Sequence, residues 1–442
     1  MTGSDTIAAI ATAPGRGGVA VVRVSGPDAW LVAERVSGRR IREEDAGRFF
    51  FSRFTAAPCA ATPEGGGRMA DSGLVLVFKG PRSYTGEDVV EFHGHGGSVS
   101  PRRVLEACFA AGARLANRGE FTERAFLNGK LDLSAAEAVI DLIDARAGRA
   151  ADDAQARLHG ALMPVFGRLY GELVDMSARV EHLLDVSEDE IPEGMLDGIV
   201  EGIGSARRRI ASLLSTAHEG KVLREGALVV LAGAPNAGKS SLMNALLGES
   251  RAIVSDCAGT TRDSIEEGMD IDGWPIRLVD TAGLRDTRDP IEAEGVRRAE
   301  SLVGRADVVV ALDCDVKGAI AVHAKCDLDG PDAVSGHGVG DAAIRVSSKT
   351  GEGLDALKRR IVERLEELAA RPSDANADAD VTARQVALLE RAHAALDTVD
   401  ASEPVLAANS LRRAAESVGQ IIGKVYSDDL LESIFSRFCV GK

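Results

Sequence analysis

Eight residues near the middle of the chain have the types and spacing that bind nucleotide phosphates. Gly233-Ala-Pro-Asn-Ala-Gly-Lys-Ser240 fits the pattern G-x-x-x-x-G-K-[ST], and it follows an apolar run at 228–231 that is typical of a buried strand. Glycines let backbone N–H groups turn toward phosphate oxygens, Lys239 can reach the β- and γ-phosphates, and the Ser240 hydroxyl can bind Mg²⁺. The alternative is a chance glycine-rich turn between a strand and a helix, which this context disfavours.

Two short motifs downstream have the order and spacing of the accompanying magnesium and γ-phosphate loops. Asp280-Thr-Ala-Gly283 ends an apolar run at 276–279, so Asp280 can support Mg²⁺ and the Gly283 N–H can contact the γ-phosphate. Gly259-Thr-Thr261 lies between this motif and the phosphate loop, where Thr261 is a candidate further Mg²⁺ ligand. Leu284 stands where Ras-like enzymes have a water-orienting glutamine. We therefore expect an acid of the same loop to orient water, and the candidates are Asp286, Asp289, Glu292 and Glu294.

Two further loops can distinguish guanine from adenine. Ala324-Lys-Cys-Asp327 matches the motif Asn-Lys-x-Asp except that alanine replaces asparagine. Asp327 can accept from guanine N1–H and N2–H₂, a bidentate contact that adenine cannot make. Ser347-Ser-Lys349 suits the second base-contacting loop. The sequence therefore predicts GTP binding rather than ATP binding.

These loops lie in a segment of alternating strands and helices that interrupts a helical region. Residues 1–122 mix short apolar runs with glycine turns, which is typical of a small α+β domain. Helical periodicity follows, starting at the capping box Ser134-Ala-Ala-Glu137 and interrupted by the acidic turn at 187–192. After the linker at 372–380 we expect three more helices, the last at 427–438 with Ser427 as its cap. We expect the two helical blocks to pack together, because neither buries its apolar stripes alone.

The parallel sheet of the inserted segment is expected to depart from the usual pattern. Only residues 314–318 separate an apolar strand ending in Asp313 from the strand that starts at Ala319. A parallel crossover normally takes a dozen or more residues, so we expect the usual helix to be replaced by a short extended link.

Composition excludes several classes of protein. The net charge of −16 disfavours non-specific coating of nucleic acid, although a local basic surface stays possible. The six cysteines are scattered without a Cys-x-x-Cys pair, which indicates reduced thiols rather than a zinc site or a disulfide framework. No basic–apolar leader and no stretch long enough to span a membrane is present, so we expect a cytoplasmic protein.

Motifs spread along the whole chain resemble the MnmE (TrmE) family of tRNA-modification GTPases. They are Ala13-Pro-Gly-Arg-Gly-Gly18, Ser83-Tyr-Thr-Gly-Glu-Asp88, His93-Gly-His-Gly-Gly97, Gly119-Glu-Phe-Thr-Glu-Arg-Ala-Phe-Leu-Asn-Gly-Lys-Leu-Asp132, Leu223-Arg-Glu-Gly226 and the terminal Phe438-Cys-Val-Gly-Lys442. Val440 departs from the isoleucine usual in that family. The resemblance implies a multidomain protein. Its parts are a tetrahydrofolate-binding, dimerising α+β domain (1–122), a discontinuous all-α domain (123–222 and 367–442) and an inserted Ras-like α/β G domain (223–366).

The same resemblance implies an activity and partners. GTP hydrolysis would be coupled, with the flavoprotein MnmG, to adding an aminomethyl or carboxymethylaminomethyl group at C5 of the wobble uridine (position 34) of certain tRNAs. The one-carbon unit would come from 5-formyl- or 5,10-methylene-tetrahydrofolate, and FAD is expected on the partner. We expect a homodimer that joins MnmG in a heterotetramer. In this family K⁺ takes the place of an arginine finger, and paired G domains activate each other.

Matching positions carry the family's site residues onto this sequence. Folate-contacting residues are Arg23, Glu87, Lys130 and Lys442; K⁺-binding residues are Asn236, Ser255, Cys257 and Thr260; Glu292 is implied to orient water. From the motifs themselves, we expect Ser240 and Thr261 as Mg²⁺ ligands and Lys239 as a catalytic residue, and Cys439 is a further catalytic candidate. The expected GTP-binding residues are Asn236, Ala237, Gly238, Lys239, Ser240, Ser241, Ser255, Asp256, Cys257, Ala258, Gly259, Thr260, Thr261, Asp280, Thr281, Ala282, Gly283, Ala324, Lys325, Cys326, Asp327, Ser347, Ser348 and Lys349.

Some residues and functions keep two interpretations. Cys439 is either a nucleophile in one-carbon transfer or a buried small residue after Phe438. His93 and His95 could bind a metal, but a glycine-rich structural turn is favoured because no third ligand is nearby in sequence. A ribosome-assembly or RNA-binding GTPase is disfavoured because no basic RNA-binding tail follows the G domain. A scaffold without hydrolysis is disfavoured by the intact Lys239, Ser240, Thr261 and Asp280.

Overall fold

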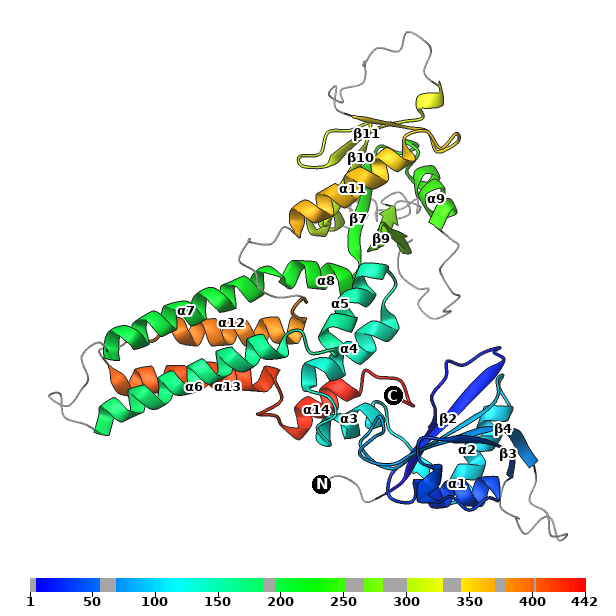
Figure 1. The fold of residues 1–442 in the computed structure, drawn as a ribbon. Helices are drawn as coiled ribbons and strands as arrows, with labels where there is room; N and C mark the ends of the chain where they lie inside the picture. Colours follow the sequence, from blue (N-terminus) through cyan, green and yellow to red (C-terminus); the bar gives the residue numbers. More distant parts are fainter. Residues whose placement is uncertain are drawn as a thin grey trace, which may run out of the picture. The chain divides into compact units, whose positions relative to one another are not determined.

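The computed structural model describes residues 5–55, 69–185, 195–250, 266–280, 300–328, 343–369, 379–400 and 403–442 (Figure 1). The chain forms two compact units, which we call the N-terminal unit (Met1–Ile140 with Gly419–Lys442) and the central unit (Asp141–Val418). The division falls within helices α4 (Leu133–Asp144) and α13 (Pro404–Ile421). The expected domain boundaries at 122, 222 and 366 stay predictions.

A six-stranded sheet organises the N-terminal unit, with the order β3-β4-β5-β2-β1-β6. The strands are β1 (Ile7–Ile10), β2 (Val19–Ser25), β3 (Phe49–Thr55), β4 (Met69–Phe78), β5 (Val89–His95) and β6 (Arg114–Leu115). β6 pairs with β1 in parallel, and the other neighbours are antiparallel. Helices α1 (Ala29–Ser37) and α2 (Ser100–Ala110) share a buried apolar core with side chains of β2, β4 and β5.

Strand β2 alternates between this core and the opposite face of the sheet. Val22 and Val24 are buried in the core, so Arg23 and Ser25 lie on the other face, because successive strand residues alternate. The apolar part of that face includes Ile7 and Phe121, the latter from helix α3 (Glu120–Leu127). The alternation therefore places an arginine on the face of the sheet that contacts α3.

Two expectations about helices in this unit need correction. Helix α4 begins at Leu133, and Oδ1 of Asp132 accepts from the Ala135 N–H at 2.8 Å, so Ser134 lies inside the first turn instead of forming the predicted cap. Aspartate is an equally good cap, and it stands one residue before the helix. Helix α14 (Asp428–Phe435) has the predicted Ser427 cap, but it belongs to the N-terminal unit, where it packs against α3.

The central unit contains the predicted parallel sheet, with the order β12-β11-β10-β7-β9-β8. Its strands are β7 (Ala227–Gly233), β8 (Glu266–Ile271), β9 (Trp274–Asp280), β10 (Val308–Leu312), β11 (Ile320–Ala324) and β12 (Ile344–Val346). Only β8 pairs in the antiparallel sense among these described strands. Helices α9 (Lys239–Ser250) and α11 (Leu354–Leu368) share its apolar core.

The predicted absence of a helix between β10 and β11 is confirmed. Residues 313–319 form a short link with a turn closed by the Ala319 N–H and the Val316 carbonyl at 3.0 Å. Val310 lies opposite Ile320, so β11 starts level with the middle of β10 and runs past its end. From the end of β10 at Leu312, the chain has to go back only as far as the level of Val310 before β11 begins. A short link is therefore enough to connect this parallel pair.

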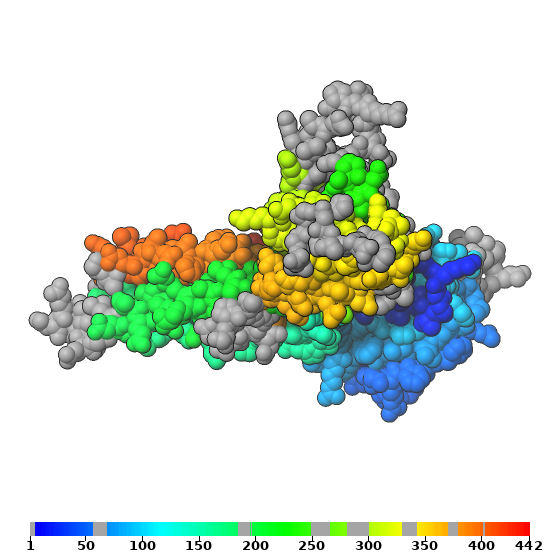
Figure 2. All heavy atoms as spheres, turned by 90° about the horizontal axis from the view of Figure 1, so that it is seen from above, coloured from blue at the N-terminus to red at the C-terminus, as the bar shows by residue number. Residues whose placement is uncertain are grey.

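Helices that precede and follow the inserted sheet in the sequence also belong to the central unit. They are α5 (Gly148–Leu158), α6 (Met163–Asp185), α7 (Met195–Ser215), α8 (Ala217–Glu225) and α12 (Ala383–Asp397), with most of α13. Helix α12 packs on α7, and in Figures 1 and 2 the orange α12 runs along the green α7. Ion pairs join Arg207 to Asp397 and Arg412 to Glu181. The two helical blocks therefore pack together in the central unit, whereas α14 belongs to the N-terminal unit.

Candidate functional site

The phosphate loop connects the central strand β7 to helix α9. Gly233 has φ 154°, and a Cβ there would lie 2.8 Å from the Leu312 carbonyl oxygen, so a larger residue does not fit. Asn236 and Gly238 also have positive φ, at 63° and 102°. These left-handed residues turn the backbone sharply between strand and helix, and the loop ends at the start of α9, where N–H groups favour anions.

Lys239 lies across this loop. Its side chain is almost wholly enclosed, at 4% exposure, and Nζ donates to the carbonyl oxygens of Gly233 (2.9 Å) and Ala234 (2.8 Å). The ammonium group is therefore held next to the backbone that would surround the phosphates. A cation in that place can contact the phosphate oxygens that carry most of the negative charge during hydrolysis.

Ser240 and Asp280 meet at the carboxyl end of the sheet. Asp280 ends β9 and is 2% exposed, and its Oδ2 accepts a hydrogen bond from the Ser240 hydroxyl. The β7–β9 register places Asp280 opposite Leu231, beside the start of the loop. Oxygen ligands of this type suit Mg²⁺, which keeps several waters and needs few protein groups. The pair could hold the ion, with Ser240 as direct ligand and Asp280 binding its waters.

The two predicted base-contacting loops are joined to each other and to the phosphate loop. The Ser347 hydroxyl donates to Asp327 Oδ1 at 2.7 Å, which fixes the direction of that carboxylate. Lys325, at φ 60°, donates to the Asn236 carbonyl oxygen at 2.7 Å. Ala324 ends β11 without a side-chain amide, so Lys325 and Ser347 supply the bracing seen here.

Several predicted residues lie outside the described part of the chain. They are Ser255, Asp256, Cys257, Ala258, Gly259, Thr260, Thr261, Thr281, Ala282, Gly283 and Glu292, together with the alternative acids Asp286, Asp289 and Glu294. The structure therefore neither places nor excludes them.

A second group of charged and aromatic residues lies in the N-terminal unit. We call Arg23, Tyr84, Glu91, Phe121 and Lys442 the N-terminal cluster. Arg23 Nε donates to Glu91 Oε1 at 2.9 Å, and its guanidinium lies 5.1 Å from the Tyr84 ring centre and 5.7 Å from that of Phe121. Its Nη1 atom is buried and has no hydrogen-bond partner in the described structure. Burial of such a donor is costly unless a further acceptor is bound.

The C-terminal tail brings Lys442 to this cluster. The Phe121 N–H donates to the Lys442 carbonyl oxygen at 3.2 Å, and the Gly119 N–H donates to that of Cys439 at 3.4 Å. A Cβ at Gly441 would lie 2.3 Å from the Ile10 carbonyl oxygen, so the tail is closely packed. Burial and the neighbouring Arg23 charge lower the pKa of the Lys442 ammonium group. Cys439 is exposed, so the interpretation of Cys439 as a buried small residue is wrong.

The other two predicted folate residues lie at the loop between β4 and β5. Glu87 accepts from the Ser25 hydroxyl at 2.8 Å and from Arg124 Nη1 at 3.1 Å. Lys130 Nζ donates to the Pro81 carbonyl oxygen at 3.0 Å. Arg23 and Ser25 share one face of β2, so the structure brings Arg23, Glu87 and Lys442 to the same side of the sheet, with Lys130 bound to the same loop as Glu87.

Sequence reasoning missed two residues here. Glu91 lies opposite Arg23 in the β2–β5 register. Burial would raise the pKa of Glu91, but hydrogen bonds from His93 and Arg23 together with the Arg23 charge lower it. Arg124 was noticed only as part of a motif. The pattern Glu-x-x-x-Arg at 120–124 on a helix was the available signal.

His93 and His95 both contact carboxylates on strands of the N-terminal sheet. His93 contacts Glu91 Oε2 at 3.0 Å, and His95 Nδ1 contacts Asp71 Oδ1 at 2.7 Å. Among the residues that the structure describes, no three His, Cys, Asp or Glu side chains gather in a way that could hold a metal ion. Both histidines lie on β5, so they belong to a strand rather than to the predicted glycine-rich turn. No helix of the described residues is long and apolar enough to cross a membrane.

The inserted sheet, its phosphate loop and the Ser240–Asp280 pair define a P-loop nucleotide hydrolase. Two family models match the chain: "MnmE helical domain" over residues 133–439 and "GTP-binding protein TrmE N-terminus" over residues 6–130. The chain is 42% identical to the tRNA modification GTPase MnmE of Laribacter hongkongensis over 99% of both chains, and 42% identical to that of Symbiobacterium thermophilum over 100% of both. It therefore belongs to the MnmE (TrmE) family and is a GTPase, as the motifs predicted.

Solved structures similar to part of the chain include the G domain of the T. maritima FeoB iron transporter. That protein is 27% identical, covers 31% of this chain and 98% of its own, and has a TM-score of 0.21. The family assignment therefore comes from the full-length relatives and the two family models.

Proposed function

We propose that this GTPase modifies tRNA. It hydrolyses GTP to GDP and phosphate and, with a flavoprotein of the MnmG type, adds a (carboxymethyl)aminomethyl group to C5 of the wobble uridine of certain tRNAs. The observation that supports this best is the phosphate loop with Lys239 enclosed against it, in a chain that matches named tRNA modification GTPases over its full length. Nucleoside mass spectrometry of tRNA from cells lacking the gene tests the proposal. Loss of a 5-substituted wobble uridine supports it, and an unchanged nucleoside profile contradicts it.

In the G domain, Ser240 and Thr261 would hold Mg²⁺, and Asn236, Ser255, Cys257 and Thr260 would hold K⁺. The hydroxyl and carboxylate oxygens of Ser240 and Asp280 fit a hard divalent ion. Mg²⁺ neutralises phosphate charge during hydrolysis. Glu292 would orient water, and Lys239 would bind the β- and γ-phosphates.

The ion and water assignments have separate tests. K⁺ should raise the GTPase rate and Na⁺ should not replace it, so equal rates in the two salts would contradict the K⁺ assignment. Glu292→Ala should lower kcat with little change in GTP affinity. Activity lost instead in Asp286→Ala or Asp289→Ala would assign the role to a different acid.

In the N-terminal unit, Arg23, Glu87, Lys130 and Lys442 would bind a reduced folate, which supplies the one-carbon unit. The residues fit such a ligand: the buried Arg23 Nη1 lacks an acceptor, and Tyr84 and Phe121 offer aromatic surface beside it. Arg23 and Lys442 add positive charge for an anionic glutamate tail in a protein of net charge −16. The exposed Cys439 would be the nucleophile. Titration with 5-formyltetrahydrofolate tests this: Arg23→Ala should abolish binding, and unchanged affinity would contradict the site.

The N-terminal unit would form a homodimer through a second copy of its own sheet. Edge strand β3 exposes Phe49 (68%) and Phe51 (70%), and β4 exposes Leu74 opposite Phe51. An apolar patch on an edge strand is a pairing surface that a monomer normally protects. Light scattering should give a dimer for the wild-type chain and a monomer for Phe51→Lys. A monomeric wild type would contradict the proposal.

We expect the dimer to bind tRNA and to join MnmG in a heterotetramer in the cytoplasm. FAD would bind to the partner.

A further inference from the structure

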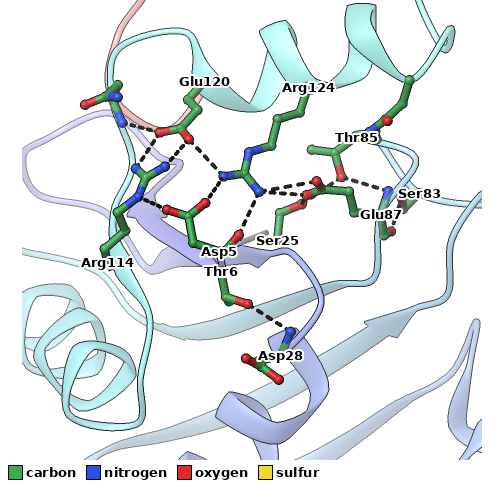
Figure 3. Close-up of polar contacts among 12 residues, drawn as sticks. Asp5, Thr6, Ser25, Asp28, Ser83, Thr85, Glu87, Arg114, Glu120 and Arg124 are labelled. Atoms are coloured by element: carbon green, nitrogen blue, oxygen red, sulfur yellow. Dashed lines mark hydrogen bonds and ion pairs between the residues drawn. The ribbon is translucent and has the colours of Figure 1, made fainter. Parts of the chain in front are cut away.

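The N-terminal unit contains a connected network of charged side chains, shown in Figure 3. It consists of Asp5, Glu87, Arg114, Glu120 and Arg124. Arg124 and Glu120 are 6% and 8% exposed. Asp5 and Arg114 are 46% and 41% exposed, so the burial falls on Arg124 and Glu120. Burying the Arg124 charge is costly unless it is fully paired, so its partners need an explanation.

Arg124, on α3, contacts three acidic residues of the unit: Asp5 before β1, Glu87 in the β4–β5 loop and Glu120 on α3. Its Nη1 donates to Glu87 Oε1 (3.3 Å), Glu87 Oε2 (3.1 Å) and the Asp5 carbonyl oxygen (3.0 Å). Its Nη2 donates to Asp5 Oδ1 (3.0 Å) and Glu120 Oε1 (2.9 Å). In Figure 3 the guanidinium lies between Asp5 and Glu120 on one side and Glu87 on the other. A planar fork with several donors can make these contacts together, whereas a lysine ammonium cannot reproduce the geometry.

Glu87 is therefore held from several directions. Besides Arg124, the Ser25 hydroxyl donates to Oε2, and the Ser25 hydroxyl also contacts that of Thr85 at 2.7 Å. The backbone of Glu87 is fixed as well, because its N–H donates to the Thr85 hydroxyl at 3.2 Å and its carbonyl oxygen accepts from Ser83. A carboxylate offers about four lone-pair positions, and the contacts above do not fill them all, so a fixed Glu87 carboxylate can accept further hydrogen bonds from a ligand with adjacent N–H groups.

Arg114 belongs to the same network, but among the described residues its ion pairs are with Asp5 and Glu120 and not with Glu87. It donates to Asp5 Oδ2 and to both oxygens of Glu120. A role limited to stability would apply to both arginines, whereas a role in ligand binding would apply to Arg124 alone.

We propose that Arg124 is a positioning residue that fixes the Glu87 carboxylate for recognition of the adjacent N–H donors of a 2-amino-pyrimidinone ring. This inference rests on the proposed folate function, since a pterin contains such a ring. It also assigns a purpose to the motif at 119–132: α3 provides Arg124, while Asn128 donates to the Thr85 carbonyl oxygen at 2.7 Å and so holds the same loop.

A double-mutant cycle on the full-length protein tests the proposal, with 5-formyltetrahydrofolate as the titrated ligand. Arg124→Lys should weaken binding at least about tenfold, because it removes the fork that orients the half-buried Glu87 carboxylate. Glu87→Gln should weaken binding as well. The double variant should bind no worse than Glu87→Gln alone, to within about twofold, because Arg124 acts through Glu87.

Arg114→Lys is the matched control. It should lower the midpoint of thermal unfolding by an amount similar to Arg124→Lys but change ligand affinity less than about twofold. If Arg124→Lys does not fold, Ser25→Ala replaces it in the cycle, because the Ser25 side chain also donates to Glu87. We expect Ser25→Ala to lose less affinity than Arg124→Lys, and to cause no further loss when it is combined with Glu87→Gln.

The outcomes separate the two proposals. Independent, multiplying losses for Arg124→Lys and Glu87→Gln, or equal losses for Arg114→Lys and Arg124→Lys, would overturn the positioning role. A wild-type protein that does not bind 5-formyltetrahydrofolate would overturn the folate proposal itself.

Discussion

The phosphate loop and the N-terminal cluster both offer positive charge to an anionic ligand, but they are built in different ways. The phosphate loop is a single run from Gly233 to Ser240, and backbone geometry shapes it. The N-terminal cluster draws on two strands, a loop, a helix and the last residue of the chain, with Arg23 and Lys442 at its centre. A site of the first kind depends on local backbone conformation, and one of the second kind depends on the fold of the whole unit.

The cationic side chains of the two regions also have different contacts. Lys239 Nζ donates to the backbone carbonyl oxygens of Gly233 and Ala234. Arg23 and Arg124 instead contact carboxylates, namely Glu91 and Glu87. Mutations and pH should therefore affect the two sites independently.

The largest effect is expected from removing the tail. Deleting Cys439–Lys442 removes the Lys442 charge and the backbone contacts to Gly119 and Phe121, so tRNA modification should be abolished. The GTPase rate should stay nearly unchanged, because the phosphate loop lies in the other unit. Both activities are measured on one protein, with Val440→Ala, an exposed position, as control. Retained modification would show that the tail is dispensable.

Lys239→Ala should reduce kcat for GTP hydrolysis about 10²–10³-fold, the range seen when one group that stabilises transition-state charge is removed. Lys317→Ala, at an exposed lysine of the β10–β11 link, serves as the control and should leave the rate unchanged. A steady-state phosphate-release assay measures both. Less than about tenfold loss for Lys239→Ala would argue against its contact with the phosphates.

Asp327→Asn should shift base preference by about tenfold or more from GTP toward XTP, because an amide can donate to the 2-oxo group of xanthine. The asparagine oxygen can still accept from Ser347, so the loop should keep its shape. Ala324 should leave guanine preference largely intact. Competition of labelled GTP with XTP and ATP measures this, and a wild type that takes ATP as readily as GTP would refute the guanine prediction.

The smallest effect concerns acid stability. The Arg114 hydrogen bond lowers the pKa of Asp5. Burial opposes ionisation of Glu120, but hydrogen bonds from Arg114, Asn117 and Arg124 lower its pKa overall. Their stabilising effect is fully present above the ordinary carboxyl values of 3.8 and 4.5 and is lost as the pH falls through the lowered values. As the pH is lowered below about 4.5, the midpoint temperature of unfolding should decrease. The decrease per pH unit should be smaller in Arg114→Gln than in the wild type. Equal slopes would contradict the assignment.

The phosphate loop and the sheet around it could be predicted because their signals are local. Apolar runs, glycines and a lysine at fixed spacing identified β7, β10, β11 and the loop, and the short β10–β11 link was readable from its length. The Arg23–Glu91 pair could not be predicted, because it depends on the register of strands 68 residues apart. The predicted cap of α4 is wrong because Asp132 and Ser134 are both good capping residues only two positions apart, and the sequence pattern does not decide between them. The packing of α14 on α3 is likewise a tertiary property.

Paired titrations most directly test the claim that one chain has two separate ligand sites. Calorimetry with GDP and with 5-formyltetrahydrofolate would be run on the wild type, on Lys239→Ala and on the chain lacking Cys439–Lys442. We predict that Lys239→Ala loses nucleotide affinity and keeps folate affinity, and that the truncated chain does the reverse. A variant that loses both ligands, or a truncated chain that binds folate as the wild type does, would contradict the account.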